Sequence, residues 1–123
     1  MLNGLIANFT VSADRIGGLF EHFIFNQLTD SAAAFDQPIR LSTFRTEHGA
    51  ELDFVLERGR EVVGIEVKAS RIVSTTDGRG FGRFADYYGR RFRSIVLYLG
   101  RETKRIGSVE ILPWRKGLKE LGW

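Results

Sequence analysis

Three residues in the middle of the chain have the types and spacing of a metal-dependent hydrolytic site. Asp53 is followed thirteen positions later by Glu66, and then by Lys68. Two carboxylates with free oxygens suit a hard divalent cation such as Mg²⁺. A lysine beside them can orient or deprotonate a water that attacks a phosphate ester. The same residues can instead form a solvated cluster of ion pairs on an exposed sheet face, which contributes only about 0–1 kcal/mol.

Two strands joined by a tight turn must position these residues. Side chains alternate across a strand, so the even-numbered apolar residues of the strand 51–57 are expected on one face and Asp53 on the other. In the strand 61–69, Glu66 and Lys68 share a face. A hairpin that turns between the two strands places Asp53 opposite Glu66 or its neighbour. The two carboxylates are therefore predicted to converge, with the ammonium of Lys68 beside them.

Helices are predicted over 14–29 and 81–92, where apolar residues recur at three- and four-residue steps and form one buried face. The polar, glycine-rich stretch 74–80 is predicted as a loop in which Thr76 or Asp77 caps the second helix. Short apolar runs between turn-forming links predict strands. These strands span 39–46, 51–57, 61–69, 94–99 and 109–112.

The order of these elements predicts an α/β fold with a central mixed sheet flanked by helices. A helix is followed by a three-strand meander, a second helix and two more strands, which is the order α-β-β-β-α-β-β. The charged stretch 101–107 is predicted as a turn between the last two strands. The tail 114–123 is predicted to form one or two helical turns.

The bulk composition is that of an ordinary globular protein. A length of 123 residues, with 43% apolar and 27% charged residues, argues against disorder and fits one domain over 1–123. The absence of cysteine excludes disulfides and metal–thiolate sites, which points to a reducing cytosol. No run of about 18 apolar residues exists and residues 1–14 lack signal-peptide character. The sequence therefore predicts a cytoplasmic protein without membrane contact.

Arginine dominates the positive charge. It accounts for 14 of the 18 basic residues, and the formal net charge is +3. The guanidinium group binds phosphate through two parallel hydrogen bonds, so this bias suits a nucleic-acid partner, although a solvated arginine surface explains it equally well. The candidate phosphate contacts are Arg79, Arg83 and Arg45, and Arg45 can instead pair with Glu51.

A longer pattern around these residues resembles a known family. Besides Asp53 and Glu66-Val67-Lys68, it comprises Gly18-Leu19-Phe20-Glu21, Phe44-Arg45-Thr46, Ile95-Val96-Leu97-Tyr98 and Leu112-Pro113. Together these segments are similar to the nuclease-like C-terminal domain of bacterial and archaeal AAA+-type ATPases, a domain of unassigned function in the PD-(D/E)XK superfamily. The resemblance covers roughly Gly17 to Trp114.

The resemblance implies a restriction-endonuclease-like fold and a role for each matching residue. Asp53 and Glu66 would hold Mg²⁺ or Mn²⁺, and Lys68 would assist the attacking water. Glu21 on the first helix would complete the site, although its place at the edge of the apolar stripe also suits a surface residue. Leu52 stands where a proline often precedes the first acid in that superfamily.

Three functions remain open at this stage. The first is a metal-dependent phosphodiesterase, a nuclease that acts on DNA or RNA. The second is a non-catalytic module that binds nucleic acid or protein and serves an ATPase module in the same or another chain, because this sequence has no G-x-x-x-x-G-K-[ST] loop of its own. The third is a homodimer that forms through edge strands and the tail tryptophans Trp114 and Trp123.

Overall fold

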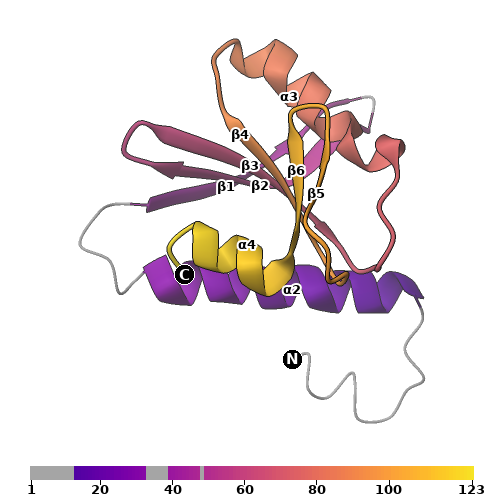
Figure 1. Cartoon of the computed structure of the whole chain (residues 1–123). Coiled ribbons are helices and arrows are strands. Elements are labelled where there is room, and N and C mark those ends of the chain that lie inside the picture. The colour runs from indigo at the N-terminus through magenta and orange to yellow at the C-terminus, as the bar shows by residue number, and fades with distance from the viewer. Residues whose placement is uncertain (1–12, 33–38, 48) are drawn as a thin grey trace.

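The computed structural model describes residues 13–32, 39–47 and 49–123. Within this part of the chain, six strands form one mixed sheet with helices on both faces (Figure 1). The expectation about a signal peptide concerns residues that lie almost wholly outside the described ranges. No helix in the described ranges combines the length and the apolar character that a membrane span requires. The elements are α2 (Ala13–Ala32), β1 (Ile39–Arg45), β2 (Glu51–Arg58), β3 (Glu61–Lys68), the 3₁₀ turn η1 (Thr75–Gly78), α3 (Arg79–Tyr88), β4 (Arg93–Tyr98), β5 (Lys104–Ile106), β6 (Val109–Pro113) and α4 (Trp114–Glu120).

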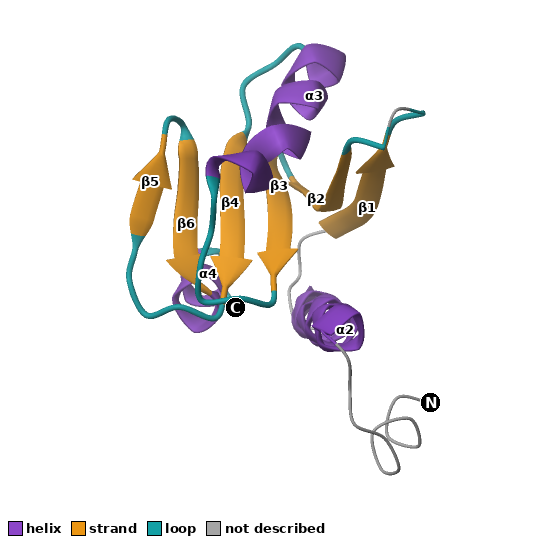
Figure 2. Ribbon diagram, turned by 90° about the vertical axis from the view of Figure 1, so that its right-hand side faces the viewer, coloured by secondary structure: helices purple, strands orange, loops and turns teal. Residues whose placement is uncertain are grey.

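The sheet combines an antiparallel and a parallel half. Its strand order is β1-β2-β3-β4-β6-β5, with β1, β2 and β3 as the predicted antiparallel meander. Strand β4 runs parallel to β3, and β6 runs parallel to β4. A parallel pair needs a long crossover, which η1 and α3 provide between β3 and β4 (Figure 2). The predicted mixed α/β sheet is therefore confirmed.

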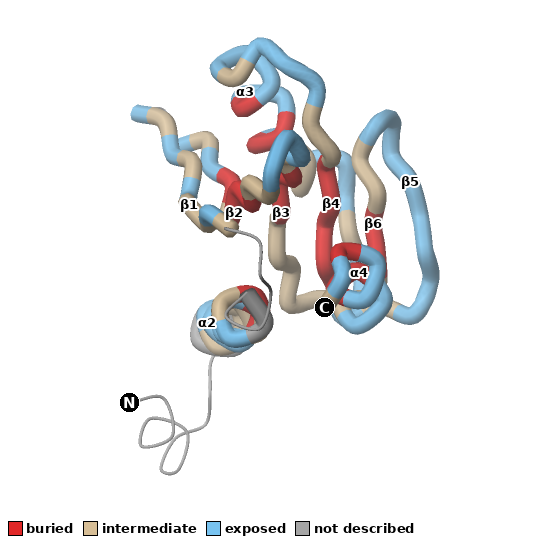
Figure 3. Tube along the Cα trace, turned by 90° about the vertical axis from the view of Figure 1, so that its left-hand side faces the viewer, coloured by how far each residue is buried: buried red, intermediate tan, exposed pale blue. Residues whose placement is uncertain are grey.

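The predicted turn over 101–107 is wrong, because this stretch contains the sixth strand. Strand β5 pairs antiparallel with β6 at the edge of the sheet. All three of its residues, Lys104, Arg105 and Ile106, are exposed, and Figure 3 draws the whole strand in the exposed colour. A charged edge strand is held by backbone hydrogen bonds rather than by an apolar face, so it leaves no periodic signal in the sequence.

Apolar side chains form one core on each side of the sheet. The core under α2 and α4 lies on one face of the central strands, and its buried residues are Ile24, Leu28, Phe54, Leu56, Val63, Ile65, Ile95, Leu97, Leu112, Leu118 and Leu121. The core under α3 is smaller and consists of Leu52, Val55, Phe81, Phe84, Val96, Tyr98 and Ile111. Strands β2, β4 and β6 thus contribute buried residues to both cores. Burial on both faces is typical of parallel strands, and β4 and β6 belong to the parallel half of this sheet.

The register between β1 and β2 shifts at one point. Their register pairs Ser42 with Val55 but Phe44 with Leu52. One residue of β1 therefore faces the two residues Asp53–Phe54, which is the geometry of a β-bulge. Bulges bend a strand and re-aim a side chain, and they are common beside functional sites.

The predicted side-chain faces of the second strand are wrong, because the bulge interrupts the alternation. Leu52 packs in the core under α3, whereas Phe54 and Leu56 pack in the core under α2. These even-numbered residues therefore do not share one face. The irregularity includes Asp53, so the sequence position that carries the chemistry is also the one where simple alternation fails.

Helix α3 begins and ends earlier than predicted. It starts at Arg79 after Gly78, within the stretch that was predicted as a loop. Gly89 closes it in the left-handed conformation, with φ of 71°. Asp77 does not cap this helix, because its carboxylate accepts the backbone N–H of Ser74 at 2.7 Å and closes the preceding 3₁₀ turn.

The predicted helical tail is confirmed as α4, and both of its tryptophans pack within the molecule. The ring of Trp114 lies edge-on to Phe23 at 5.2 Å between centroids. The indole N–H of Trp123 donates to the carbonyl of Leu28 at 3.1 Å, which fastens the end of the chain to α2. Homodimer formation through these rings stays a prediction.

Candidate active site at the split between β2 and β3

The two candidate metal ligands lie where β2 and β3 separate. Backbone pairing between these strands ends at Phe54 and Ile65, while β3 continues along β4. Beyond that point, side chains take the place of the backbone ladder. The N–H of Asp53 donates to Oε1 of Glu66 at 2.9 Å, and the N–H of Val67 donates to Oδ2 of Asp53 at 2.7 Å. The predicted convergence of the two carboxylates is thus confirmed.

Burial makes this acid pair unfavourable as two full anions. Burial, followed by the charge of Asp53, raises the pKa of Glu66 to about 8. Burial also raises the pKa of Asp53 above its ordinary value. Among the described residues, no lysine or arginine forms an ion pair with either carboxylate. Near neutral pH the pair therefore retains a proton unless a cation compensates its charge.

Glu21 lies in the electrostatic field of the acid pair, as the sequence predicts. It is half-buried on α2. Burial raises the pKa of its carboxyl, and the charges of Asp53 and Glu51 raise it further. The charge of Asp53 therefore acts on Glu21, and the role of Glu21 in the site stays a prediction.

Lys68 is not in contact with the acid pair, contrary to the prediction. Its Nζ lies 3.2 Å from Oδ1 of Asp77, on the loop that follows β3. Partial burial raises the pKa of the Asp77 carboxyl. Hydrogen bonds from the Ser74 N–H and from Lys68 outweigh this effect, so the pKa lies below its ordinary value. The sequence predicted Asp77 only as a helix cap and not as the partner of Lys68. A serine followed three residues later by an acid is the pattern of a reciprocal cap, which Ser74 and Asp77 form here.

An open, polar cavity of about 350 Å³ lies beside these groups. Glu66 and Asp77 line it, whereas Asp53 and Lys68 do not, so the carboxylate that pairs with Lys68 faces the same space as one member of the acid pair. Gly80 brings α3 against β2 here, since a Cβ at this position would collide with the carbonyl oxygen of Glu51. The full lining is Gly49, Ala50, Glu51, Glu66, Thr76, Asp77, Arg79 and Gly80.

The three candidate phosphate contacts have different surroundings. Arg45 Nε lies 3.2 Å from Glu51 Oε2, and both side chains are largely exposed, so the alternative of pairing with Glu51 is the one found. Arg79 lines the polar cavity, and Arg83 lies one helical turn further along α3. Neither Arg79 nor Arg83 forms an ion pair with any described residue.

The acid pair does not by itself form a closed metal site. Within the ranges that the structure describes, no three acidic or histidine side chains gather in an arrangement that could hold a metal ion by themselves. Asp53 and Glu66 provide two carboxylates. This is the number that Mg²⁺ commonly takes from a protein when waters and substrate phosphates complete its shell.

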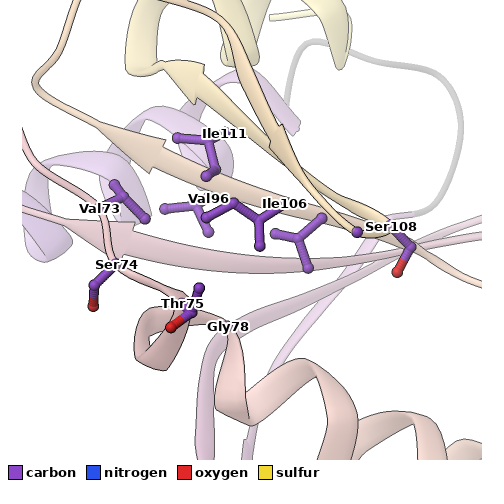
Figure 4. Close-up of a pocket in the computed structure, with 10 residues that line it drawn as sticks. Val73, Ser74, Thr75, Gly78, Val96, Ile106, Ser108 and Ile111 are labelled. Atoms are coloured by element: carbon purple, nitrogen blue, oxygen red, sulfur yellow. The ribbon is translucent and has the colours of Figure 1, made fainter.

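A second cavity, of about 260 Å³, lies between the loop 73–78, β4 and the β5–β6 hairpin (Figure 4). Val73, Val96 and Ile111 give it apolar walls, and Ser74 and Thr75 add hydroxyl groups at one side. No charged side chain lines it. None of the predicted site residues lines this cavity.

Comparison with known proteins identifies a family but no characterised relative. The model of the family described as a domain of unknown function, DUF4143, matches residues 16–116. This domain is often found in ATPase-associated proteins. No curated protein and no solved structure matches the chain.

Proposed function

The chain belongs to the DUF4143 family, and we propose that it is a divalent-metal-dependent phosphodiesterase that acts on nucleic acid, with a restriction-endonuclease-like fold of the PD-(D/E)XK type. One observation carries the proposal. Asp53 and Glu66 approach each other in the split between β2 and β3, where Glu66 accepts the backbone N–H of Asp53 and Asp53 accepts that of Val67. No cation of the described chain neutralises them. A mixed sheet whose meander carries these acids supports the fold part of the proposal.

The chemistry of the acid pair fits Mg²⁺ or Mn²⁺. Each carboxylate uses one oxygen for a backbone hydrogen bond. The two carboxyls also hydrogen-bond to each other, and a metal would replace the proton that they share. Hard oxygen donors are the ligands that these ions prefer. Asp53 and Glu66 would hold the ion, and Glu21, whose pKa is raised by burial and by the charge of Asp53, would complete its shell. When bound, the ion would lower the pKa of a water and stabilise the charge that develops on the phosphate.

Lys68 would be the positioning group for the attacking water. Its ammonium is already held at the cavity by Asp77, and both side chains keep some exposure to solvent, 43% and 19%. An ion pair of this exposure is worth about 0–1 kcal/mol, so exchanging Asp77 for a water costs little. Lys68 and Glu66 extend from the same face of β3, which puts the exchanged ammonium within reach of the acid pair.

A second function is favoured by the same lysine. Because Lys68 pairs with Asp77 instead of the acids, the chain also suits a non-catalytic module that binds nucleic acid or protein and serves an ATPase. The association of DUF4143 domains with ATPase-associated proteins supports this alternative. It predicts binding without cleavage.

Cleavage assays with an isosteric variant test the proposal. Supercoiled plasmid, single-stranded DNA and RNA are incubated with the protein in Mg²⁺ and in Mn²⁺, beside Asp53→Asn. The amide still accepts the Val67 N–H but lacks the charge, so we expect loss of cleavage by about a hundredfold or more. Glu57→Gln, in the same strand and apart from the acid pair, is the matched control and should cleave normally.

Two outcomes contradict the nuclease proposal. Cleavage by Asp53→Asn at the wild-type rate would mean that another site, or a contaminant, does the cutting. Absence of cleavage by the wild-type protein, together with absence of Mn²⁺ binding by calorimetry, would leave the non-catalytic alternative.

A further inference from the structure

Three side chains follow one exposed stripe along α3. Arg79, Arg83 and Tyr87 are spaced at four-residue steps, which puts them on neighbouring turns of the same helix face. All three are exposed, and Tyr87 keeps 76% of its surface open to solvent. The stripe begins at the polar cavity, because Arg79 lines it together with Glu66. Its length from Arg79 to Tyr87 is about 12 Å at the rise of an α-helix.

The positive charge of this stripe is not compensated by the rest of the described chain. Arg79 and Arg83 form no ion pair there, and neither do Arg90 and Arg91, which follow the helix. Asp86 is the one acidic residue of α3. Unpaired arginines along a helix that leads to an acidic cavity are complementary to a polyanion whose backbone approaches that cavity.

The tyrosine adds a flat and well-supported ring to this charge. Tyr87 lies 5.5 Å from Phe44 and 6.4 Å from Phe84 between ring centroids, so β1 and the core under α3 hold it from one side. The rest of the ring faces solvent. An exposed aromatic ring beside arginines is the arrangement on which proteins stack unpaired bases.

We propose that the outer stripe of α3, which is Arg79, Arg83 and Tyr87, binds single-stranded nucleic acid and leads it to the cavity beside Glu66. The two arginines would contact successive phosphates and Tyr87 would stack on one base. A duplex keeps its bases stacked on each other, so the ring distinguishes a single strand from a duplex. This inference rests on the proposed function for the direction in which the strand leads, but the binding itself does not require cleavage.

Fluorescence anisotropy in EDTA tests the stripe without cleavage. The full chain is titrated into a labelled oligothymidine and into a labelled hairpin duplex at several salt concentrations. We expect Tyr87→Ala to weaken binding of the single strand by about fivefold or more, and to leave binding of the duplex unchanged. Arg83→Ala should reduce the slope of log affinity against log salt by about 0.7 for the single strand.

Arg101→Ala is the matched control, because Arg101 is an exposed arginine that follows the carboxyl end of β4, whereas α3 leads to the amino end of that strand. It should bind like the wild type. Equal affinity for duplex and single strand, or wild-type binding by Tyr87→Ala and Arg83→Ala, would overturn the inference. Asp53→Asn is titrated in parallel and should bind like the wild type. If the wild-type protein cleaves no substrate but the stripe variants lose binding, the catalytic proposal is wrong and the binding proposal stands.

Discussion

Carboxylates at two places on this sheet have opposite electrostatic surroundings. At the start of β4, the guanidinium of Arg93 donates to both oxygens of Glu110, at 2.7 and 3.0 Å, and to Glu120 at 3.0 Å. At the split between β2 and β3, Asp53 and Glu66 meet backbone N–H groups and each other. Arg93, Glu110 and Glu120, here called the Arg93 cluster, include a cation. The acid pair has no cationic partner among the described residues.

The two surroundings shift acidity in opposite directions. Hydrogen bonds from Arg93 lower the pKa of Glu110, while burial and the charge of Asp53 raise the pKa of Glu66 to about 8. A carboxylate that only supports the fold is neutralised by a partner in the chain. A carboxylate kept without such a partner costs stability, and retaining it is a common feature of functional sites. This difference separates structural from candidate catalytic acids here.

The largest expected effect comes from removing the cation of the Arg93 cluster. Arg93→Ala would leave the half-buried Glu110 without two charged hydrogen bonds and the exposed Glu120 without one, so we expect a loss of about 3 kcal/mol in the free energy of unfolding at neutral pH. Urea denaturation measures it, with the exposed and unpaired Arg91→Ala as the control. A loss no greater than that of Arg91→Ala would remove the contrast between the two regions.

Removing one charge from the acid pair should have the opposite effect. Glu66→Gln keeps an acceptor for the Asp53 N–H and deletes the charge, so we expect it to raise the free energy of unfolding by about 2 kcal/mol above pH 8. Near the ordinary glutamate value of 4.5 the gain should vanish, because wild-type Glu66 is then protonated in the folded state. Urea denaturation across this pH range measures the difference.

The sign of this pH dependence distinguishes the two regions. The pKa of Glu66 is raised on folding, so its contribution to stability is fully present below 4.5 and is lost as the pH rises through about 8. The pKa of Glu110 is lowered, so its contribution is present above 4.5 and is lost as the pH falls. A wild-type protein and a Glu66→Gln variant with identical pH profiles would contradict the assigned surroundings.

A divalent ion should supply the acid pair with the cation that it lacks. At ten times its dissociation constant, Mn²⁺ is expected to raise the stability of the wild-type protein by about 1.4 kcal/mol, and EDTA should reverse the gain. Asp53→Asn should gain nothing. Equal stabilisation of both proteins in thermal unfolding would place the ion elsewhere on the molecule.

The sequence predicted the acid pair because a hairpin limits its own register. Arg58 pairs with Glu61 across a tight turn, so Asp53 and Glu66 must follow the last backbone pair. The bulge on β2 could not be predicted in this way, because it is a mismatch with β1 and depends on how that strand aligns. The local pattern therefore predicted which two acids lie opposite each other. The bulge that includes Asp53 depends instead on the alignment of β2 with β1.

The partner of Lys68 and the sixth strand were missed for a related reason. Asp77 reaches Lys68 only because the crossover loop returns over β3, a path that no local pattern encodes. Strand β5 has three exposed residues and exists through its pairing with β6. Both depend on contacts between distant segments, and alternation or helical periodicity reports only the segment in which it occurs.

The smallest predicted effect concerns the ion pair between Lys68 and Asp77. Asp77→Asn keeps an acceptor for the Ser74 N–H but removes the charge that holds Lys68, so we expect a loss below about 1 kcal/mol in the free energy of unfolding. Glu102→Gln, which removes the charge from the looser, exposed pair with Lys104 at 3.9 Å, is the matched control in urea denaturation. A loss of about 3 kcal/mol, like that of Arg93→Ala, would make Lys68 a structural cation. The lysine would then belong with the Arg93 cluster, and it could not exchange Asp77 for a water at the acid pair.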